Sequence, residues 1–162
     1  MRGPPEGADL CARVAGYLRA HHTMTIATVD PVGNTPHAAC VFYAVDEDLR
    51  LVFLSKPAGV HGSHIGKQAP VAVTVTEQYV DWETIQGVQL WGEARLLGGT
   101  AKAGALAVYL KRFPFVRDIM TRPGLADLMR GIGVYRVTPY RAAFTDNTTG
   151  VFGREVLEPV TE

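Results

Sequence analysis

The residues best suited to chemistry gather in one short segment, 54–64, whose sequence is LSKPAGVHGSH. A strand is expected to end here and a short helix at about 63–68 to begin, so that backbone amides of the helix start would join the side chains. Hydroxyl, ammonium and imidazole groups that converge on one place suit a phosphate group. The candidate phosphate ligands are Ser55, Lys56, His61, Ser63 and His64. On composition alone an ordinary solvated loop is an equally open interpretation. The segment is not a P-loop, because the Gly-x-x-x-x-Gly-Lys spacing is absent.

A metal site is a weaker interpretation of the same histidines. His61 and His64 stand three residues apart and could share one face of a helix. No cysteine or carboxylate pair follows at ligand spacing, so we expect no metal. His21 and His22 are adjacent and are expected at the end of a helix, where cations are favoured.

Side chains for acid–base or nucleophilic catalysis are scarce. The sequence has no Gly-x-Ser-x-Gly motif and no ordered Ser, His and Asp set, and the paired carboxylates at 46–48 fall in a predicted turn. We therefore expect no catalytic side chain. A bound redox cofactor would not need one, because it carries the chemistry itself.

A second group of candidates lies on a long strand predicted at 84–97. Gln86, Gln89 and Trp91 are expected on its solvent-facing side. A large aromatic side chain on such a face usually covers a partner subunit or a planar ligand, and the glutamines could hydrogen-bond the edge of that ligand. Simple exposure of all three is equally open.

The elements that would position these residues are mostly strands. A helix is expected from Asp9, as its N-cap, to about residue 20, and Thr100 is expected to cap a helix that ends near 112. A second helical stretch at 115–130 is interrupted at Pro123-Gly124. Apolar alternation predicts strands at 23–29, 36–45, 49–54, 71–76, 84–97 and 133–139, the last one continuing over 140–145 after a kink at Pro139. This order predicts a mainly β fold, a closed barrel with peripheral helices, and a β-sandwich is the alternative.

Composition limits the classes of protein that this chain can belong to. Its 162 residues suit one domain, here 9–162 after a loose lead at 1–8, and 47% hydrophobic with 20% charged residues is typical of a globular protein. Sixteen basic residues balance sixteen acidic ones, which argues against binding to nucleic acid or to a membrane surface. Residues 1–10 lack the pattern of a signal peptide, so we expect a cytoplasmic protein. Two buried free thiols, Cys11 and Cys40, are favoured over a disulfide.

Taken in order, these segments resemble the pyridoxamine 5′-phosphate oxidase-like family of FMN-binding split barrels. The resemblance covers about residues 9–153 and rests on 23–30 (TMTIATVD), 36–43 (PHAACVFY), 51–55 (LVFLS), 61–75 (HGSHIGKQAPVAVTV) and 87–97 (GVQLWGEARLL). A small bacterial branch of the family has a similar Arg112-Phe-Pro114 helix end and a similar tail, Phe144-Thr-Asp-Asn-Thr148 followed by Phe152-Gly153.

The resemblance implies a six-stranded antiparallel split barrel that binds FMN in a cleft between the two subunits of a homodimer. The FMN phosphate would lie against Ser55, Lys56, His61 and Ser63 or His64. The flavin ring would contact the second strand at Ala39, Cys40 and Val41, and Gln86, Gln89 and Trp91 would complete the site. A small barrel is filled by its own side chains, which independently places a flavin outside it, in a groove that a second subunit can close. The implied activity is FMN-dependent oxidation or reduction of a small molecule.

Two departures from the oxidase proper narrow this expectation. His61 stands where the oxidase has the lysine of its phosphate motif, and one weakened charge-assisted contact costs about 1–2 kcal/mol, or roughly tenfold in affinity. The tail at 154–159 lacks the Arg-Leu-x-Pro ending that binds substrate, so pyridoxamine phosphate is not the expected substrate.

Two alternatives to an FMN-dependent enzyme stay open. One is a flavin-binding protein without enzymatic activity, and the other is a haem-binding split barrel whose axial ligand would be one of His21, His22, His37, His61 and His64.

Overall fold

The computed structural model describes residues 6–150 and 153–158, with the side chains of 6–8 and 128 left aside. Residues 1–5 of the predicted lead lie outside the described residues, as do Phe152 and Pro159. Among the described helices, none is long and apolar enough to cross a membrane.

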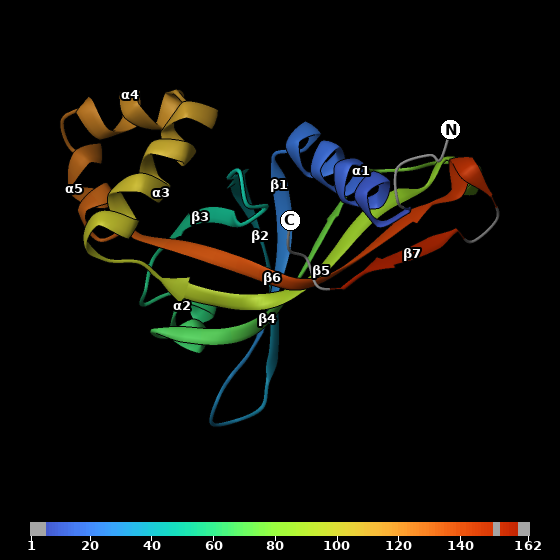
Figure 1. The fold of residues 1–162 in the computed structure, drawn as a ribbon. Coiled ribbons are helices and arrows are strands. Elements are labelled where there is room, and N and C mark those ends of the chain that lie inside the picture. Colours follow the sequence, from blue (N-terminus) through green and yellow to red (C-terminus); the bar gives the residue numbers. More distant parts are fainter. Residues whose placement is uncertain (1–5, 151–152, 159–162) are drawn as a thin grey trace.

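Six antiparallel strands close into a barrel, with a seventh strand added outside it (Figure 1). The sheet order is β3-β2-β1-β4-β5-β6-β7, and pairing of β3 with β6 closes the ring. The barrel strands are β1 (Thr23–Val29), β2 (Pro36–Val45), β3 (Leu51–Ser55), β4 (Gln68–Thr76), β5 (Gln86–Leu96) and β6 (Gly133–Asp146), and the added strand is β7 (Arg154–Leu157). The prediction of a closed barrel is confirmed, and the sandwich alternative is wrong because β3 and β6 share a ladder.

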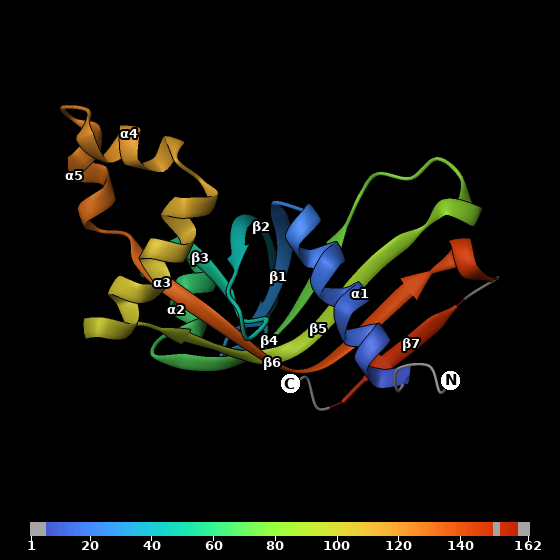
Figure 2. The same ribbon diagram turned by 45° about the horizontal axis from the view of Figure 1, so that its top comes forward.

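Helices lie around this barrel in three groups (Figures 1 and 2). α1 (Glu6–Ala20) packs over β5, β6 and β7, and α2 (Val60–Ile65) packs against β1, β2, β4 and β5. α3 (Gly99–Arg112), α4 (Phe115–Thr121) and α5 (Leu125–Arg130) form the third group, with α3 against β2, β3 and β6. Two short 3₁₀ turns complete the chain. η1 (Trp82–Thr84) precedes β5, and η2 (Asn147–Thr149) directly follows β6.

Three predicted helix starts are wrong, although the helices themselves exist. α1 begins at Glu6, so Asp9 lies inside the helix and is not its N-cap. Gly98 occupies the cap position of α3, which places Thr100 within the first turn. α2 begins at Val60 and not at residue 63. Pro123 and Gly124 separate α4 from α5, as predicted.

The core follows from strand alternation. Met24, Ile26 and Thr28 of β1 are buried inside the barrel, and their neighbours on the strand face outward. Ile65 of α2 belongs to the same core and anchors this helix at one end of the barrel. A separate apolar cluster on the outside of the barrel holds the third group of helices, and it includes Ala44, Val52, Val134, Tyr109, Phe113 and Val116.

A bulge at Trp91 and Gly92 lets β5 bend against β6. A Cβ atom placed on Gly92 would lie 2.5 Å from the backbone oxygen of Thr138 and 3.0 Å from the Cα of Pro139. Both neighbours are backbone atoms, which cannot move aside as a flexible side chain would. Glycine is therefore required at position 92, where the backbones of the paired strands β5 and β6 come this close.

We expect Gly92→Ala to lower the free energy of unfolding by about 1–3 kcal/mol, because the added methyl group overpacks the crossing of the two strands. Gly16→Ala is the matched control, since a Cβ on Gly16 in α1 meets no atom of the described residues within 4 Å. This control should be neutral or stabilising by about 0.5–1 kcal/mol. Urea unfolding of both variants measures the difference, and equal stabilities would contradict the packing argument.

Candidate functional site

The loop after β3 folds back because Gly62 allows a very close approach. A Cβ atom on Gly62 would overlap the carbonyl oxygen of Lys56 and would lie 2.9 Å from that of Pro57. Only a residue without a side chain fits between the start of α2 and this loop. The same turn returns His61 to the end of β3, where its Nε2 is hydrogen bonded to the Ser55 hydroxyl at 2.6 Å.

Three imidazole rings from two elements meet at this end of the barrel. His37 of β2 stacks on His61, with ring centroids 6.0 Å apart and planes 10° from parallel. His37 also meets the edge of His64, with centroids 5.9 Å apart at 86°. His64 Nδ1 is hydrogen bonded to the buried Thr28 hydroxyl at 3.0 Å. We call His37, His61 and His64 the histidine cluster.

Burial and proximity to the other two rings make a charge on His61 unfavourable. The pKa of His61 is lowered, first by burial of its ring and then by the neighbouring His37 and His64. Among the described residues, no group of three or more His, Cys, Asp or Glu side chains has the geometry to hold a metal ion. What the cluster offers is a set of imidazole nitrogens beside a hydroxyl group, able to donate hydrogen bonds to an anion.

Lys56 and Ser63 lie near the histidine cluster but differ in what they can offer. Lys56 is exposed in the loop directly after Ser55, so its ammonium group can reach a ligand at the barrel end. The Ser63 hydroxyl donates a hydrogen bond to the backbone oxygen of Val60, at 2.7 Å, within its own helix. Of the five candidate phosphate ligands, Ser55, His61 and His64 are thus joined in one site, with Lys56 beside them.

The predicted contacts to a flavin ring fall on two sides of β2. Ala39 and Val41 turn inward and pack against the barrel core, whereas Cys40 lies on the outer face and is exposed. Cys11 and Cys40 are free within the described residues, but the prediction that both are buried is wrong. Cys40 is exposed because side chains alternate along a strand, and its two neighbours on β2 both face inward.

The outer face of this sheet is built mainly from small side chains. In one row across the strands Ala27 pairs with Ala38 on β2 and with Ala72 on β4, which in turn pairs with Trp91 on β5. The Arg141 guanidinium lies 5.0 Å from the Trp91 ring centroid. The next row across the strands contains Cys40, Thr25, Thr74 and Gln89. We call these two rows the outer sheet face. The side chain of Gln89 on this face accepts a hydrogen bond from Arg154 at 2.9 Å.

Gln86 does not lie on the outer sheet face, and its predicted orientation is wrong. Its side-chain amide donates to Asp146 at 3.0 Å, and Asp146 also pairs with Arg13 of α1 at 3.2 Å. Gln86 is three residues from Gln89, an odd spacing that places the two side chains on opposite faces of one strand. Gln86 therefore joins the contacts that hold α1 on the sheet.

His37 and Thr28 belong to the site but were missed as candidates for phosphate binding. The two residues pair directly across β1 and β2, which places their side chains on the same face of the sheet. A hairpin through the turn at 30–35 would have suggested this register, since the predicted strands at 23–29 and 36–45 match the structure. The position of α2 beneath this pair depends on tertiary packing, which the sequence pattern does not contain.

Comparison with known proteins places the chain among proteins of the same architecture. Residues 11–127 match the family described as pyridoxamine 5′-phosphate oxidase. A UPF0306 protein from Klebsiella pneumoniae is 32% identical over 151 residues, covering 91% of this chain and 92% of the relative. A haem-binding protein from Mycobacterium smegmatis is similar in structure, with a TM-score of 0.69 and 18% identity over 97% of this chain and 60% of its own. General Stress Protein 26 from Bacillus anthracis has a TM-score of 0.62 and 17% identity over 92% of this chain and 98% of its own.

Acidification should destabilise the protein through His61. Because the pKa of His61 in the folded state lies below its ordinary value of 6.5, the unfolded chain binds more protons there. This part of the stability is complete above about pH 6.5 and is lost as the pH falls below that value. We expect the thermal midpoint to fall between pH 7 and pH 5, and to fall less in His61→Gln.

His22→Gln is the control for this measurement, because His22 is exposed and directly precedes β1, away from the histidine cluster. It should leave the pH dependence of the wild type unchanged. A pH profile that is the same in His61→Gln and in the wild type would remove His61 as its cause.

Proposed function

Because the chain belongs to the pyridoxamine 5′-phosphate oxidase family, we propose that it binds FMN and acts as an FMN-dependent oxidoreductase on a small molecule. The observation that carries the proposal is the histidine cluster, joined to Ser55 and flanked by Lys56 at one end of the barrel. Ser55, Lys56, His61 and His64 are also the residues that, by the family resemblance, would lie against the cofactor phosphate.

The side chains present fit a phosphate group. The Ser55 hydroxyl can donate one hydrogen bond while accepting others, and each imidazole can donate through one ring nitrogen. Lys56 supplies the full positive charge, close enough in sequence to Ser55 to act on the same group. A bound phosphate dianion would also favour protonation of His61 and so offset the effect of burial on its pKa.

The outer sheet face supports the proposed place of the flavin ring. Cys40, Gln89 and Trp91 lie on this face, and Cys40 is on the same strand as His37 of the histidine cluster. Small side chains leave room for a planar ring, while Gln89 and Trp91 offer a hydrogen-bonding amide and an aromatic surface. Bound FMN would supply the hydride or electron transfer, so the residues of the chain need only bind the cofactor and orient its ring.

We further propose a homodimer in which a second subunit covers the outer sheet face. Ala27, Ala38 and Cys40 are exposed there, and small side chains permit a partner to approach closely. Phe42 continues β2 beyond these residues and is 48% exposed, with one side of its ring against Phe113 and Phe115. Free thiols at Cys11 and Cys40 are compatible with the reducing cytoplasm proposed as the compartment.

Haem binding is the second candidate function, and the histidine cluster is the observation that favours it. Three imidazoles near the protein surface offer axial ligands to an iron porphyrin. The similar structure from Mycobacterium smegmatis is described as a haem-binding protein. Binding of the haem iron would need a ring nitrogen of His37, His61 or His64, but it would not need the ammonium group of Lys56.

Lys56→Ala should weaken FMN binding about tenfold, because one charge-assisted contact to the phosphate is lost. Quenching of FMN fluorescence during titration with the purified protein measures the affinity. Lys67→Ala is the matched control, since Lys67 is exposed just beyond the other end of α2, and it should bind FMN as the wild type does.

A colourless protein that takes up no added FMN would overturn the FMN proposal. A Soret band on haem titration that is lost in His61→Ala would then support the haem candidate. If FMN binds, bleaching of its absorption by reduced nicotinamide separates an oxidoreductase from a protein that only stores flavin.

Ala27→Glu should dissociate the dimer, because it places a charge in the centre of the outer sheet face, where burial without a partner is costly. Sedimentation velocity should show a dimer for the wild type and a monomer for the variant, together with weaker FMN binding. Ala101→Glu, on the exposed face of α3, is the control and should remain dimeric. A wild-type protein that sediments as a monomer would refute the proposed assembly.

A further inference from the structure

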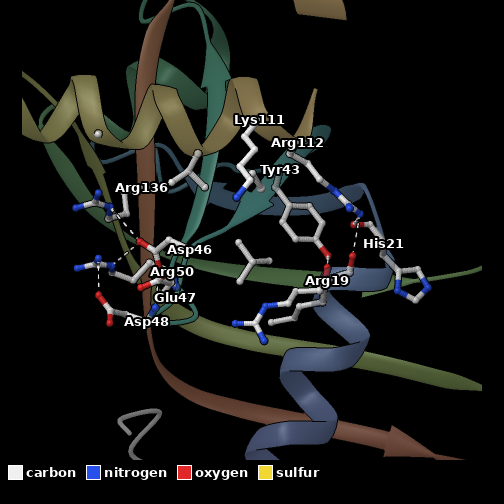
Figure 3. Close-up of a pocket in the computed structure, with 15 residues that line it drawn as sticks. Arg19, His21, Tyr43, Asp46, Glu47, Asp48, Arg50, Lys111, Arg112 and Arg136 are labelled. Carbon is white, nitrogen blue, oxygen red and sulfur yellow. Dashed lines mark hydrogen bonds and ion pairs between the residues drawn. The ribbon is translucent and has the colours of Figure 1, made fainter. Parts of the chain in front are cut away.

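A cavity of about 670 Å³ (Figure 3) is lined in part by Tyr43, Ala44 and Val45, at the opposite end of β2 from His37 of the histidine cluster. It opens between the end of α1, the last two turns of α3 and the turn that joins β2 to β3, with β6 behind. No part of the function proposed above uses it. Its volume is in the range of pockets that hold small organic molecules.

Two of the three carboxylates that line this cavity, those of Asp46 and Asp48, are paired with Arg50. The third, Glu47, is exposed and forms no ion pair within the described residues. Asp46 accepts hydrogen bonds from the Arg50 side chain at 2.8 Å and from the backbone amides of Asp48 and Arg50 at 3.0 Å. Arg50 also pairs with Asp48 at 2.5 Å. Arg112 is engaged as well, because it donates to the backbone oxygens of Arg19 and His21 at the end of α1. These groups build the wall of the cavity and hold α1 against α3.

Two other cations, Lys111 and Arg19, face the cavity and form no ion pair with a carboxylate of the described residues. They extend from α3 and α1 on its two sides (Figure 3). Arg136 at the back forms a long ion pair with Asp46, at 4.0 Å from its Nε atom, and this buried Nε has no hydrogen-bond partner among the described residues. A buried donor without a partner costs about 1–3 kcal/mol, so an added acceptor at this place would be favourable.

Apolar groups complete the lining. Leu18, Val45 and Val108 contribute aliphatic surface. The Tyr43 ring also lines the cavity, while its hydroxyl is occupied by a hydrogen bond to the backbone oxygen of Leu18 at 2.6 Å. Unpaired cations beside an apolar surface are complementary to a molecule that has an anionic group and an apolar body.

We propose that this cavity is a binding site for a small organic anion. The carboxylate or phosphate of the ligand lies between Lys111, Arg19 and Arg136, and its apolar part lies against Val108 and the Tyr43 ring. The site is distinct from the proposed FMN site, because the two are separated by most of the length of β2. Occupancy would bridge α1 and α3, which at present are joined through Arg112.

Titration calorimetry on the full chain with phenyl phosphate and with benzoate tests this proposal, and comparison of the two probes shows which anionic group is preferred. We expect saturable binding of at least one probe with a Kd below about 1 mM. Lys111→Gln and Arg19→Gln should each weaken binding about tenfold, because each removes one charge-assisted contact. Amide resonances of Val45 and Val108 should shift on addition of the bound probe.

Two controls separate this site from other anion binding. Lys102→Gln removes an exposed charge from the same helix outside the cavity and should bind the probes as the wild type does. His61→Ala should also leave benzoate binding unchanged while it weakens FMN binding, so the two proposals can fail independently. Absence of saturable binding would overturn the proposal. So would equal loss in Lys102→Gln and Lys111→Gln, or benzoate binding that depends on His61.

Discussion

The close contact of Gly62 with the carbonyls of Lys56 and Pro57 is the constraint on which the candidate site depends. It forces α2 to begin immediately beneath the end of β3, and it brings His61 back to Ser55. Ile65 then anchors the same short helix in the barrel core. A six-residue helix has little stability of its own, so its position comes from these two contacts and not from its sequence propensity.

β2 connects three surfaces of different chemistry. His37 near its start faces inward to the histidine cluster, and Cys40 in its middle faces outward among small side chains. At its end, Tyr43 and Val45 reach the cavity between α1 and α3. This arrangement follows from alternation together with the length of the strand, because ten extended residues cross the whole barrel wall. A single strand thus contributes to the histidine cluster, to the outer sheet face and to the cavity, the three places proposed above for a cofactor, a second subunit and a small anion.

Much of the fold could be predicted from the sequence because strands with one buried face alternate in polarity. The limits of β1 and β2 match the prediction, as does the break between α4 and α5 at Pro123 and Gly124. β7 was missed because Arg154–Leu157 carries no apolar alternation and is held by its pairing with β6. Helix starts were displaced by several residues, since Asp9 and Thr100 are good capping residues that lie inside helices here.

The candidate site was predicted in part, for reasons that individual residues make clear. Ser55, His61 and His64 were identified because polar groups after a strand are visible in the sequence, and the structure brings them together. His37 was not placed with them, because its contact with α2 joins segments that are distant in the chain. The Gln86 side chain was predicted on the wrong face of β5, although its odd spacing from Gln89 in the sequence places the two side chains on opposite faces. The roles of these residues in cofactor binding stay a prediction.

The ladder between β3 and β6 has a consequence for how the chain folds. These partners lie roughly 80 residues apart in sequence, with β4, β5 and α3–α5 between them. During synthesis the first five strands can pair with their neighbours, but β3 keeps an open edge until β6 emerges from the ribosome. The entropy lost in joining such distant segments makes this closure a late event. Until it occurs, the Ser55 end of β3 is a place where a nascent chain could pair with another copy or be protected by a chaperone.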